Sequence, residues 1–470
     1  MRTSAPVTRQ FESITIDRSD ASSRTLPCGP PDRRLAAGCG WNTSIHRQIS
    51  NSEIDQRKHY RTDNRFVFGF NRSETVRASA QRRRGMSSKG ENLTIGLAGL
   101  GTQGIGYARR FDQFNHTYVG ADFDADARAE FATETGSDVI ENPKKLLEYD
   151  LDGLIIALPP KFHEPIATSA LESGVDVLIE KPVAHTLYSA RQIERAASES
   201  DANAMVAFYT KFYKSTAILL GYVADGYFGD ITHVDAVIER RRGLPGRGTW
   251  FTSQDIAGGG ALIDIGIHAL DVLMAIYEYS PVKWAWGQTT TQFGNKDDYL
   301  YLETASEHKN TDLFDVEDAA SVVLEFANGG TVNLRVAWAT NNRERHEYRI
   351  HGTERGARLD LTQVYTATIG REDADIVKEE DINDREILEL YDVRSIGENH
   401  FVDSRVVAKG VDAYEEMLSS FFDGIGSSTP YDKNPIRQGV QVQKVIDSIY
   451  RSAREGEPVQ VDSFEDINRL

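Results

Sequence analysis

The feature that most constrains this chain is a short glycine-rich segment that ends an apolar run and opens a helical pattern. The segment comprises Gly99, Leu100, Gly101, Thr102, Gln103 and Gly104. The spacing lets Gly99 form a tight turn, lets a pyrophosphate approach the backbone at Gly101, and lets the helix pack closely at Gly104. Asp122 follows 23 residues after Gly99, where a carboxylate can accept hydrogen bonds from an adenosine ribose. The pattern predicts a dinucleotide-binding βαβ unit, with a purely structural glycine turn as the alternative.

The acidic residues after the second apolar run bear on which dinucleotide is bound. Asp122 and Asp124 would both repel a 2′-phosphate. The sequence therefore favours NAD, and NADP is the alternative.

Strand-like and helix-like segments alternate along residues 86–210. Repeated βαβ units of this length predict a doubly wound parallel sheet with helices on both faces, that is, an α/β Rossmann domain. Residues 211–470 predict an α+β domain with an antiparallel sheet, because longer strands follow one another there; the family resemblance given below implies that this sheet is open and mostly antiparallel. The expected strands are 231–241, 282–291, 319–327, 330–339 and 347–351, with a hairpin at Asn328-Gly329 and closing helices at 413–422 and 440–453. Residues 292–315 and 370–400 are polar and acidic, which indicates loops.

Charge divides the chain in two. Residues 1–85 hold 16 Lys and Arg against 8 Asp and Glu, a net charge of +8, whereas the remainder holds 37 against 63, a net charge of −26. For the first part we expect a start site placed too early, with Met86 beginning the protein; a disordered basic tail and a targeting arm are the alternatives. The dispersed acidity of the second part predicts a cytoplasmic protein from a high-salt organism, with an ordinary acidic protein as the alternative.

Composition also excludes several classes of protein. The overall net charge of −18 argues against a nucleic-acid partner, which needs a basic surface. The longest apolar run that we identify, 153–158, is far shorter than the ~20 residues that span a bilayer, so we expect no membrane segment. The two cysteines lie at positions 28 and 39, and no set of metal ligands is evident beyond them.

Two further motifs carry candidate catalytic groups. Lys181, in Glu180-Lys181-Pro182, follows a strand, where it can hold a substrate hydroxyl; a solvated loop lysine is the alternative. Asp264 and His268 lie four residues apart after a glycine triplet, so a helix would place them on one face. A histidine beside a carboxylate is a plausible base for a carbinol proton, whereas a buried structural histidine or a metal pair would be the other readings.

Together these motifs resemble the Gfo/Idh/MocA family, the glucose–fructose oxidoreductase and inositol dehydrogenase type, from about Leu93 to the C-terminus. The resemblance rests on the order of the glycine segment, residues 157–163, Glu-Lys-Pro and Asp264-x-Gly266-x-His268. It implies a Rossmann domain, a second open-sheet domain, a last helix that returns toward the first domain, and hydride transfer between a nicotinamide and a sugar or polyol carbon. The acidic composition adds the expectation of a haloarchaeal source.

The resemblance also implies residue roles. Lys181 would hold the reacting oxygen, His268 would be the general base, and Asp264 would orient the substrate or the histidine. Pro159 and His163 would lie near the nicotinamide half of the cofactor, with Glu180 and Lys181 also at the cofactor site. The open sheet would form a homodimer or homotetramer.

Three further residues are candidates for substrate contact: Lys211, Arg247 and Trp250. Lys211 stands where many family members have arginine before phenylalanine, and the other two adjoin the basic run 240–242. Surface pairing of that run is the alternative. A non-catalytic NAD(P)-binding regulator and a sugar oxidoreductase that retains its cofactor are the alternative functions.

Overall fold

The computed structural model describes residues 92–299, 314–364, 386–408 and 410–461. The expectations for residues 1–85, and those for loops at 300–313 and 370–385, lie outside the described residues.

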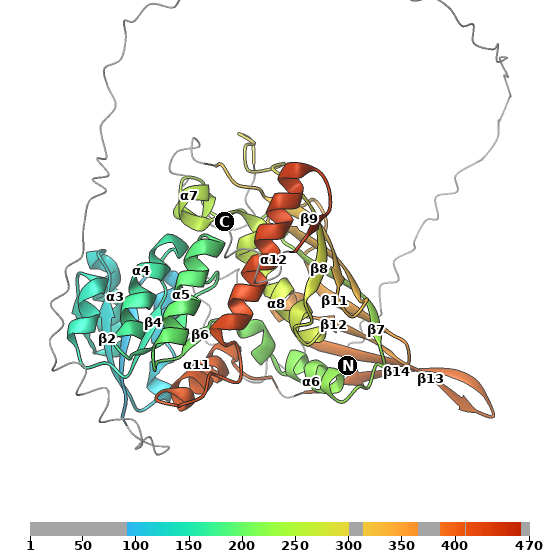
Figure 1. Cartoon of the computed structure of the whole chain (residues 1–470), viewed down its shortest axis with the longest axis horizontal. Helices are drawn as coiled ribbons and strands as arrows, with labels where there is room; N and C mark the ends of the chain where they lie inside the picture. Colours follow the sequence, from blue (N-terminus) through green and yellow to red (C-terminus); the bar gives the residue numbers. More distant parts are fainter. Residues whose placement is uncertain (1–91, 300–313, 365–385, 409, 462–470) are drawn as a thin grey trace, which may run out of the picture. The chain divides into compact units, whose positions relative to one another are not determined.

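The first sheet has six parallel strands in the order β3-β2-β1-β4-β5-β6 (Figure 1). This is the doubly wound strand order of dinucleotide-binding domains, in which ligands bind beyond the carboxyl ends of the strands. The strands are β1 Thr94–Ala98, β2 Thr117–Ala121, β3 Asp138–Ile140, β4 Gly153–Ile156, β5 Asp176–Ile179 and β6 Ala204–Val206. The intervening helices are α2 Thr102–Ala108, α3 Ala125–Thr135, α4 His163–Glu172 and α5 Leu187–Glu199, with short 3₁₀ turns at Phe111–Gln113, Pro143–Glu148 and Pro160–Phe162.

Local chemistry fixes the helix ends in this domain. Asp124 caps α3, because its side chain accepts from the backbone N–H groups of Asp126 and Ala127. The same helix ends at Gly136, whose left-handed φ of 66° suits glycine. Asp124 is therefore committed to the helix, which leaves Asp122 as the carboxylate at the strand end.

The second sheet has nine strands in the order β14-β13-β12-β11-β7-β10-β9-β8-β15. Every pairing is antiparallel except the parallel pair β7–β10, so the prediction of an α/β domain followed by a mostly antiparallel α+β domain is confirmed. The strands are β7 Ile231–Glu239, β8 Val282–Thr290, β9 Ala319–Phe326, β10 Thr331–Ala337, β11 Arg345–Gly352, β12 Gly356–Asp360, β13 Ile387–Ile396, β14 Glu398–Val406 and β15 Val459–Gln460. Its helical segments are η4 Tyr209–Phe212, α6 Lys214–Ala224, η5 Trp250–Thr252, α7 Gln254–Ala257, η6 Leu262–Gly266, α8 Ile267–Ile276, α11 Ala413–Gly424 and α12 Ile436–Glu455.

The loop predicted over 370–400 is wrong for its described part. Residues 387–406 form the hairpin β13–β14, in which the buried Leu388 and Leu390 alternate with polar residues. The segment 370–400 taken as a whole is polar and acidic, so the composition indicated a loop, although Leu388 and Leu390 follow the period of two of a strand. The structure also adds α6 and β12, for which the sequence analysis made no prediction.

The helical stretch Gln254–Ile276 is a long apolar segment that the apolar runs of the sequence did not reveal. Its 23 residues are, by length and composition, apolar enough to cross a membrane, although 89% of its most apolar window is buried within the described part of the chain. That degree of burial is typical of a core helix. Asp264, His268 and Asp271 interrupt the run, which explains why it did not stand out as a candidate span.

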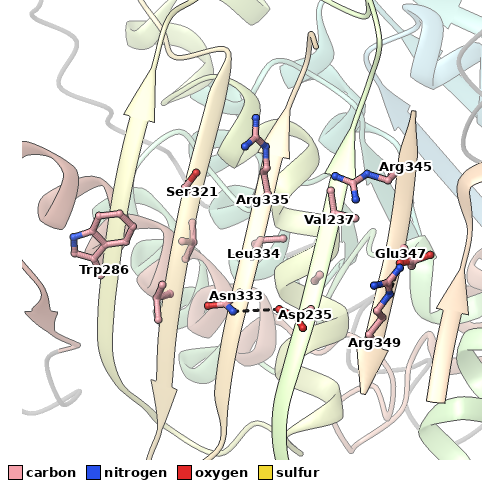
Figure 2. Close-up of a pocket in the computed structure, with 13 residues that line it drawn as sticks. Asp235, Val237, Trp286, Ser321, Asn333, Leu334, Arg335, Arg345, Glu347 and Arg349 are labelled. Atoms are coloured by element: carbon pink, nitrogen blue, oxygen red, sulfur yellow. Dashed lines mark hydrogen bonds and ion pairs between the residues drawn. The ribbon is translucent and has the colours of Figure 1, made fainter. Parts of the chain in front are cut away.

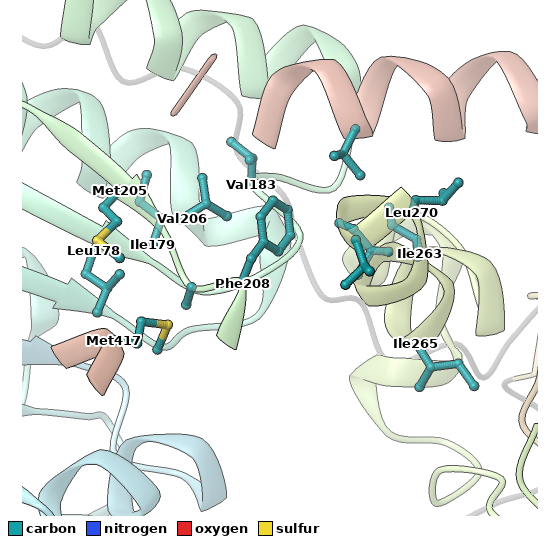
Figure 3. Packing of buried hydrophobic residues seen from close by; sticks show 14 of the residues in the cluster. Leu178, Ile179, Val183, Met205, Val206, Phe208, Ile263, Ile265, Leu270 and Met417 are labelled. Atoms are coloured by element: carbon teal, nitrogen blue, oxygen red, sulfur yellow. The ribbon is translucent and has the colours of Figure 1, made fainter. Parts of the chain in front are cut away.

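Helix α12 packs against both sheets. It contacts α5 and β6 of the first domain and α8 and β8 of the second. A single hydrophobic core runs through the same region, and Figure 3 shows its members from β5, β6, the π-helical turn and α11. They include Leu178, Ile179, Val183, Met205, Val206, Phe208, Ile263, Ile265, Leu270 and Met417. The two domains therefore meet across packed side chains rather than through a flexible linker.

Candidate active site

The three glycines of the fingerprint have three different environments. Gly99 has a φ of 95°, and a Cβ there would lie 2.5 Å from the Ala157 carbonyl oxygen. A Cβ on Gly104 would clash with the carbonyl of Gly99, so α2 packs directly on the strand end. A Cβ on Gly101 would meet nothing within 4 Å. The backbone is thus open at Gly101 alone of the three, which fits a pyrophosphate at the exposed start of α2, where Leu100, Thr102 and Gln103 adjoin it.

Asp122 lies beside this turn. Its Oδ2 accepts from the backbone N–H of Leu100 at 2.8 Å, and its Oδ1 accepts from that of Asp124 at 2.9 Å. Two backbone donors therefore fix the carboxylate at the end of β2, next to the glycine turn. A carboxylate has further lone pairs on both oxygens, so this position fits a ribose diol.

His163 and Pro159 follow β4, but the histidine faces the interior. The side chain of His163 is fully buried, with Nε2 2.6 Å from the Leu158 carbonyl oxygen and Nδ1 3.1 Å from that of Pro182. Burial lowers the pKa of its imidazole, although the carbonyls favour the protonated form. His163 thus links the loops after β4 and β5 and supports the loop that carries Pro159. A place for Pro159 and His163 near the nicotinamide stays a prediction.

Glu180 is likewise turned inward. Its carboxylate accepts from the Tyr107 hydroxyl at 2.5 Å and from the backbone N–H of Lys181 at 3.0 Å. Burial raises the pKa of the Glu180 carboxyl, with the Lys181 charge opposing it. Glu180 therefore connects α2 to the end of β5 and helps to fix the start of the cis Lys181–Pro182 peptide.

Lys181 and Asp264 meet across the two domains. The Lys181 ammonium donates to Asp264 Oδ1 at 2.8 Å and to the Asp264 carbonyl oxygen at 2.9 Å. The other carboxylate oxygen, Oδ2, accepts from the indole N–H of Trp338 at 2.8 Å. Burial opposes ionisation of Asp264, but the neighbouring cations and the two hydrogen bonds outweigh it and lower the pKa of its carboxyl to about 2. Asp264 therefore orients Lys181.

The turn that carries Asp264 is π-helical, and the regular helix resumes at Ile267. Such wide turns are rare and occur often at functional sites. The sequence placed Asp264 and His268 on one face of a regular helix. In the structure the wide turn directs the Asp264 carboxylate to Lys181 and Trp338, and no hydrogen bond joins it to His268 within the described residues.

His268 lies nearby, at the start of α8. Its Nδ1 is 3.5 Å from the Thr210 hydroxyl, and its ring centre is 4.7 Å from that of Tyr209. Burial is the main reason that the pKa of the imidazole lies well below its usual range. The Lys181 charge lowers this pKa further, whereas the Asp264 charge raises it. The histidine is therefore neutral near pH 7, the state that a proton acceptor needs.

The glycine triplet before this turn is surrounded closely on every side. Any Cβ would meet the backbone of His185 at Gly258, the Tyr450 side chain at Gly259 and the backbone of Glu317 at Gly260. The buried Glu317 carboxylate also accepts from the backbone N–H groups of Gly260 and Leu262, both at 2.9 Å, and from the Tyr450 hydroxyl at 2.8 Å. These contacts anchor the catalytic turn from behind.

The three candidate substrate residues lie in different environments in the structure. Lys211 is buried, where its ammonium contacts Asp271 at 2.9 Å, the Tyr279 hydroxyl at 2.5 Å and Gln438 at 3.3 Å. Its three N–H donors thus have partners inside the protein, which removes the geometric basis for substrate contact.

Arg247 is also buried and donates to the carbonyls of Phe293 and Lys296, so it holds a loop. Trp250 is half-buried and stacks on Phe251 with ring centres 3.6 Å apart. Of the three, Trp250 remains the accessible candidate.

Sequence reasoning missed Trp338, Thr210 and Tyr209 as members of the site. Trp338 sits within a predicted strand segment and gives no separate signal. Tyr209 and Thr210 belong to the stretch that was noted only for its departure at Lys211. Tyr209 stacks on Tyr414 of α11 at 4.5 Å, so a helix 200 residues away in the chain borders the site.

Two cavities among the described residues lie away from Lys181 and His268. One, of about 730 Å³, lies behind the catalytic turn between α12 and the end of β8, and Glu317 and Tyr450 line it. The other, of about 370 Å³, is a shallow hollow on the open face of the second sheet (Figure 2). Arg335 and Arg345 line this hollow and form ion pairs with Glu239 at 2.5 and 2.9 Å. The half-exposed Trp286 also lines it.

The two sheets and the site between them define a class of protein, a Rossmann nucleotide-binding domain joined to an open-sheet domain. The chain belongs to the Gfo/Idh/MocA family of oxidoreductases. The model for the oxidoreductase family's NAD-binding Rossmann fold matches residues 93–208, and the model for the GFO/IDH/MocA C-terminal domain matches residues 220–358. The first domain is thus an NAD-binding domain.

Two of the similar proteins are named as sugar dehydrogenases. D-Glucoside 3-dehydrogenase of Escherichia coli (strain K12) is 32% identical over 229 residues, which are 48% of this chain and 63% of the relative. Levoglucosan dehydrogenase of Pseudarthrobacter phenanthrenivorans is 24% identical over 56% of this chain and 72% of its own. The chain therefore spans less than two thirds of the first relative. Among solved structures, levoglucosan dehydrogenase in complex with NADH and levoglucosan has a TM-score of 0.66 at 20% identity, covering 79% of this chain and all of that one.

Proposed function

We propose that this protein is an NAD-dependent dehydrogenase that oxidises a carbinol of a sugar, polyol or derivative, or reduces the corresponding carbonyl. The observation that carries the proposal is the convergence of Lys181, Asp264 and His268 beyond the strand ends of an NAD-binding sheet. The names of the two curated relatives support a sugar as substrate.

In this proposal each residue has a stated task. Lys181 uses the ammonium donor that remains after two bind Asp264 to hold the reacting oxygen. His268 takes the hydroxyl proton at Nε2, since Nδ1 faces Thr210. Bound NAD⁺ supplies the hydride acceptor. Gly101 and Asp122 would hold its pyrophosphate and adenosine ribose.

The test is a panel of sugars, glycosides and inositols with NAD⁺ and with NADP⁺, assayed with the full chain in molar KCl. The proposal expects oxidised sugar and reduced nicotinamide that separates from the protein on a desalting column. Oxidised sugar with no free NADH would indicate the cofactor-retaining oxidoreductase. Cofactor binding without turnover of any compound would indicate the regulator.

Asp122 provides the test of cofactor choice. Asp122→Ser should raise the use of NADP relative to NAD by about tenfold, the change that ~1.4 kcal/mol produces. Asp126→Ser is the matched control, because it removes an equal charge from the first turn of α3. A wild type that already prefers NADP would disprove the ribose assignment.

The open sheet face is proposed as the surface of a homodimer or homotetramer. Trp284 and Val323 are exposed on it, and by strand register Val393 and Phe401 continue the same face with 59% and 87% of their surface exposed. Phe401→Asp should shift the mass measured by light scattering toward the monomer, and Tyr188→Asp on α5 is the control. An unchanged mass would place any interface elsewhere.

The net charge of −26 over residues 86–470 supports the further proposal of a cytoplasmic protein from a high-salt, haloarchaeal source. Repulsion between surface carboxylates reaches farther once the Debye length exceeds ~10 Å, as it does below ~0.1 M salt. Far-ultraviolet circular dichroism during dialysis from molar to millimolar KCl should then show loss of structure. An unchanged signal and melting temperature would contradict adaptation to salt.

A further inference from the structure

Trp338 is a fully buried residue that touches the catalytic constellation without facing the substrate. It follows β10 directly, and its indole N–H donates to Asp264 Oδ2 at 2.8 Å. A buried indole N–H must find an acceptor, and here the acceptor is an ionised carboxylate. Such charge-assisted bonds are stronger than those between neutral groups.

The backbone of Trp338 is fixed on both sides. Its N–H donates to the Asp318 carbonyl at 2.9 Å, and its carbonyl accepts from the N–H of Gly243 at 2.9 Å. The segments after β7 and before β9 therefore hold the residue from opposite directions. The indole is thus a rigid part of the second sheet, independent of the helix that carries Asp264.

Three separate parts of the chain converge on the Asp264 carboxylate. The turn η6 supplies the carboxylate, the end of β5 supplies Lys181 to Oδ1, and the sheet supplies Trp338 to Oδ2. With the Lys181 contact alone, the carboxyl group could rotate about its last bond. The indole fixes the carboxylate plane, so Oδ1 and the Asp264 carbonyl together define the position of the ammonium.

We propose that Trp338 is a positioning residue for Lys181 and acts through Asp264. The catalytic consequence rests on the proposed function, whereas the geometric consequence for Lys181 does not. Trp338→Phe keeps an aromatic ring but removes the donor together with part of the indole, and Trp338→His restores a ring N–H in a smaller side chain, which separates loss of the donor from loss of volume.

Steady-state kinetics in a double-mutant cycle test the path of action. Trp338→Phe should lower kcat/KM for the sugar about 10- to 100-fold, the range expected for a lost hydrogen bond to a charged group. Trp338→His should recover part of this loss. In an Asp264→Asn background the Phe substitution should change kcat/KM by less than about twofold, because its effect passes through the carboxylate. Equal losses in both backgrounds would overturn the proposal.

Phe314→Leu is the matched control. The Phe314 ring lies edge-on to Trp338, with centres 6.5 Å apart, so the variant loosens the packing around the indole without removing its hydrogen bond. NAD⁺ affinity should stay within a few-fold of wild type in every variant. A loss in Phe314→Leu equal to that in Trp338→Phe would assign Trp338 to packing alone.

A second readout does not depend on turnover. Lys181 is labelled with an amine-acylating reagent below full modification, and its peptide is quantified by mass spectrometry at a temperature where melting curves show every variant folded. Release of Asp264 in Trp338→Phe should change the labelling rate of Lys181 severalfold, while Lys283, at the far end of the second sheet, stays constant. A wild type that oxidises no sugar would refute the proposed function and leave this measurement valid. An unchanged Lys181 rate in Trp338→Phe would refute the positioning role.

Discussion

Two lysine–aspartate pairs involve the helical stretch Gln254–Ile276, and burial affects the two pairs differently. Lys181–Asp264 and Lys211–Asp271 have nearly the same length, 2.8 and 2.9 Å. The first pair retains 18% and 13% side-chain exposure, and the pKa of Asp264 falls to about 2. The second retains 9% and 0%, and burial raises the pKa of Asp271 and lowers that of Lys211.

The difference follows from the number of additional partners and from access to water. Asp264 has Trp338 as a second donor and Arg240 as a second cation, whereas burial dominates at Asp271 despite Lys211 and Tyr279. The same chemical pair can therefore keep an ammonium ready for a substrate or join secondary-structure elements as an internal clamp. Exposure and surrounding donors decide which of the two it does.

The largest expected effect is on the exposed pair. Lys181→Met should lower kcat about 10²- to 10⁴-fold, because it removes a positioned group at the reacting oxygen. The melting temperature should change little, since Asp264 keeps Trp338 and some contact with water. Lys283→Met removes a lysine from an exposed ion pair of 2.9 Å and serves as the control for charge. Retention of more than a tenth of wild-type kcat would remove Lys181 from the chemistry.

For the buried pair we expect a loss of stability and little change in kcat. Lys211→Met should reduce the free energy of unfolding by about 3–5 kcal/mol, because it leaves the Asp271 carboxylate buried without its cation. The kcat of the folded fraction should stay within a few-fold of wild type. Denaturant unfolding in high salt measures the loss, and the double variant Lys211→Met with Asp271→Leu should recover most of it. A large fall in kcat without loss of stability would return Lys211 to the substrate site.

The smallest effect concerns pH and His268, which lies between the two aspartates in the sequence. Burial and the Lys181 charge lower the pKa of His268 below the usual value of an imidazole. Only the neutral imidazole accepts a proton, so kcat/KM for oxidation should be full above this pKa and should fall as the pH drops through it. The fall should therefore begin below pH ~6.5, and it should be absent in His268→Ala.

Removing the lysine of each pair should affect the acid limb of the kcat/KM profile, the fall at low pH, differently. Lys181→Met removes a cation that lowers the His268 pKa, so the acid limb of its residual activity should move to higher pH. Lys211→Met should leave the limb in place. Equal shifts in both variants, or a wild-type profile retained in His268→Ala, would show that His268 is structural.

Sequence reasoning predicted most of the first domain because its signals are local. The glycine turn, the cap at Asp124 and the apolar runs each depend on neighbouring residues. It could not predict that Lys211 points into the core or that Trp338 reaches Asp264, because these contacts join residues 60 and 74 positions apart. The π-helical turn could not be predicted from the sequence either, because one wide turn leaves no change in the hydrophobic period. Hairpin β13–β14 was missed because the polar and acidic composition of 370–400 as a whole hides the alternation at Leu388 and Leu390.

The glycine triplet Gly258–Gly260 has a practical consequence for redesign. Its contacts include His185, Glu317 and Tyr450, and Gln254 of α7 also bonds Gly258, through its backbone carbonyl at 3.0 Å and its side-chain amide at 2.6 Å. Trp250 precedes these contacts in the chain and stacks on Phe251. Substitutions at Trp250, with Gln254 kept, are therefore the route by which substrate range should be altered while the supports of Asp264 stay in place.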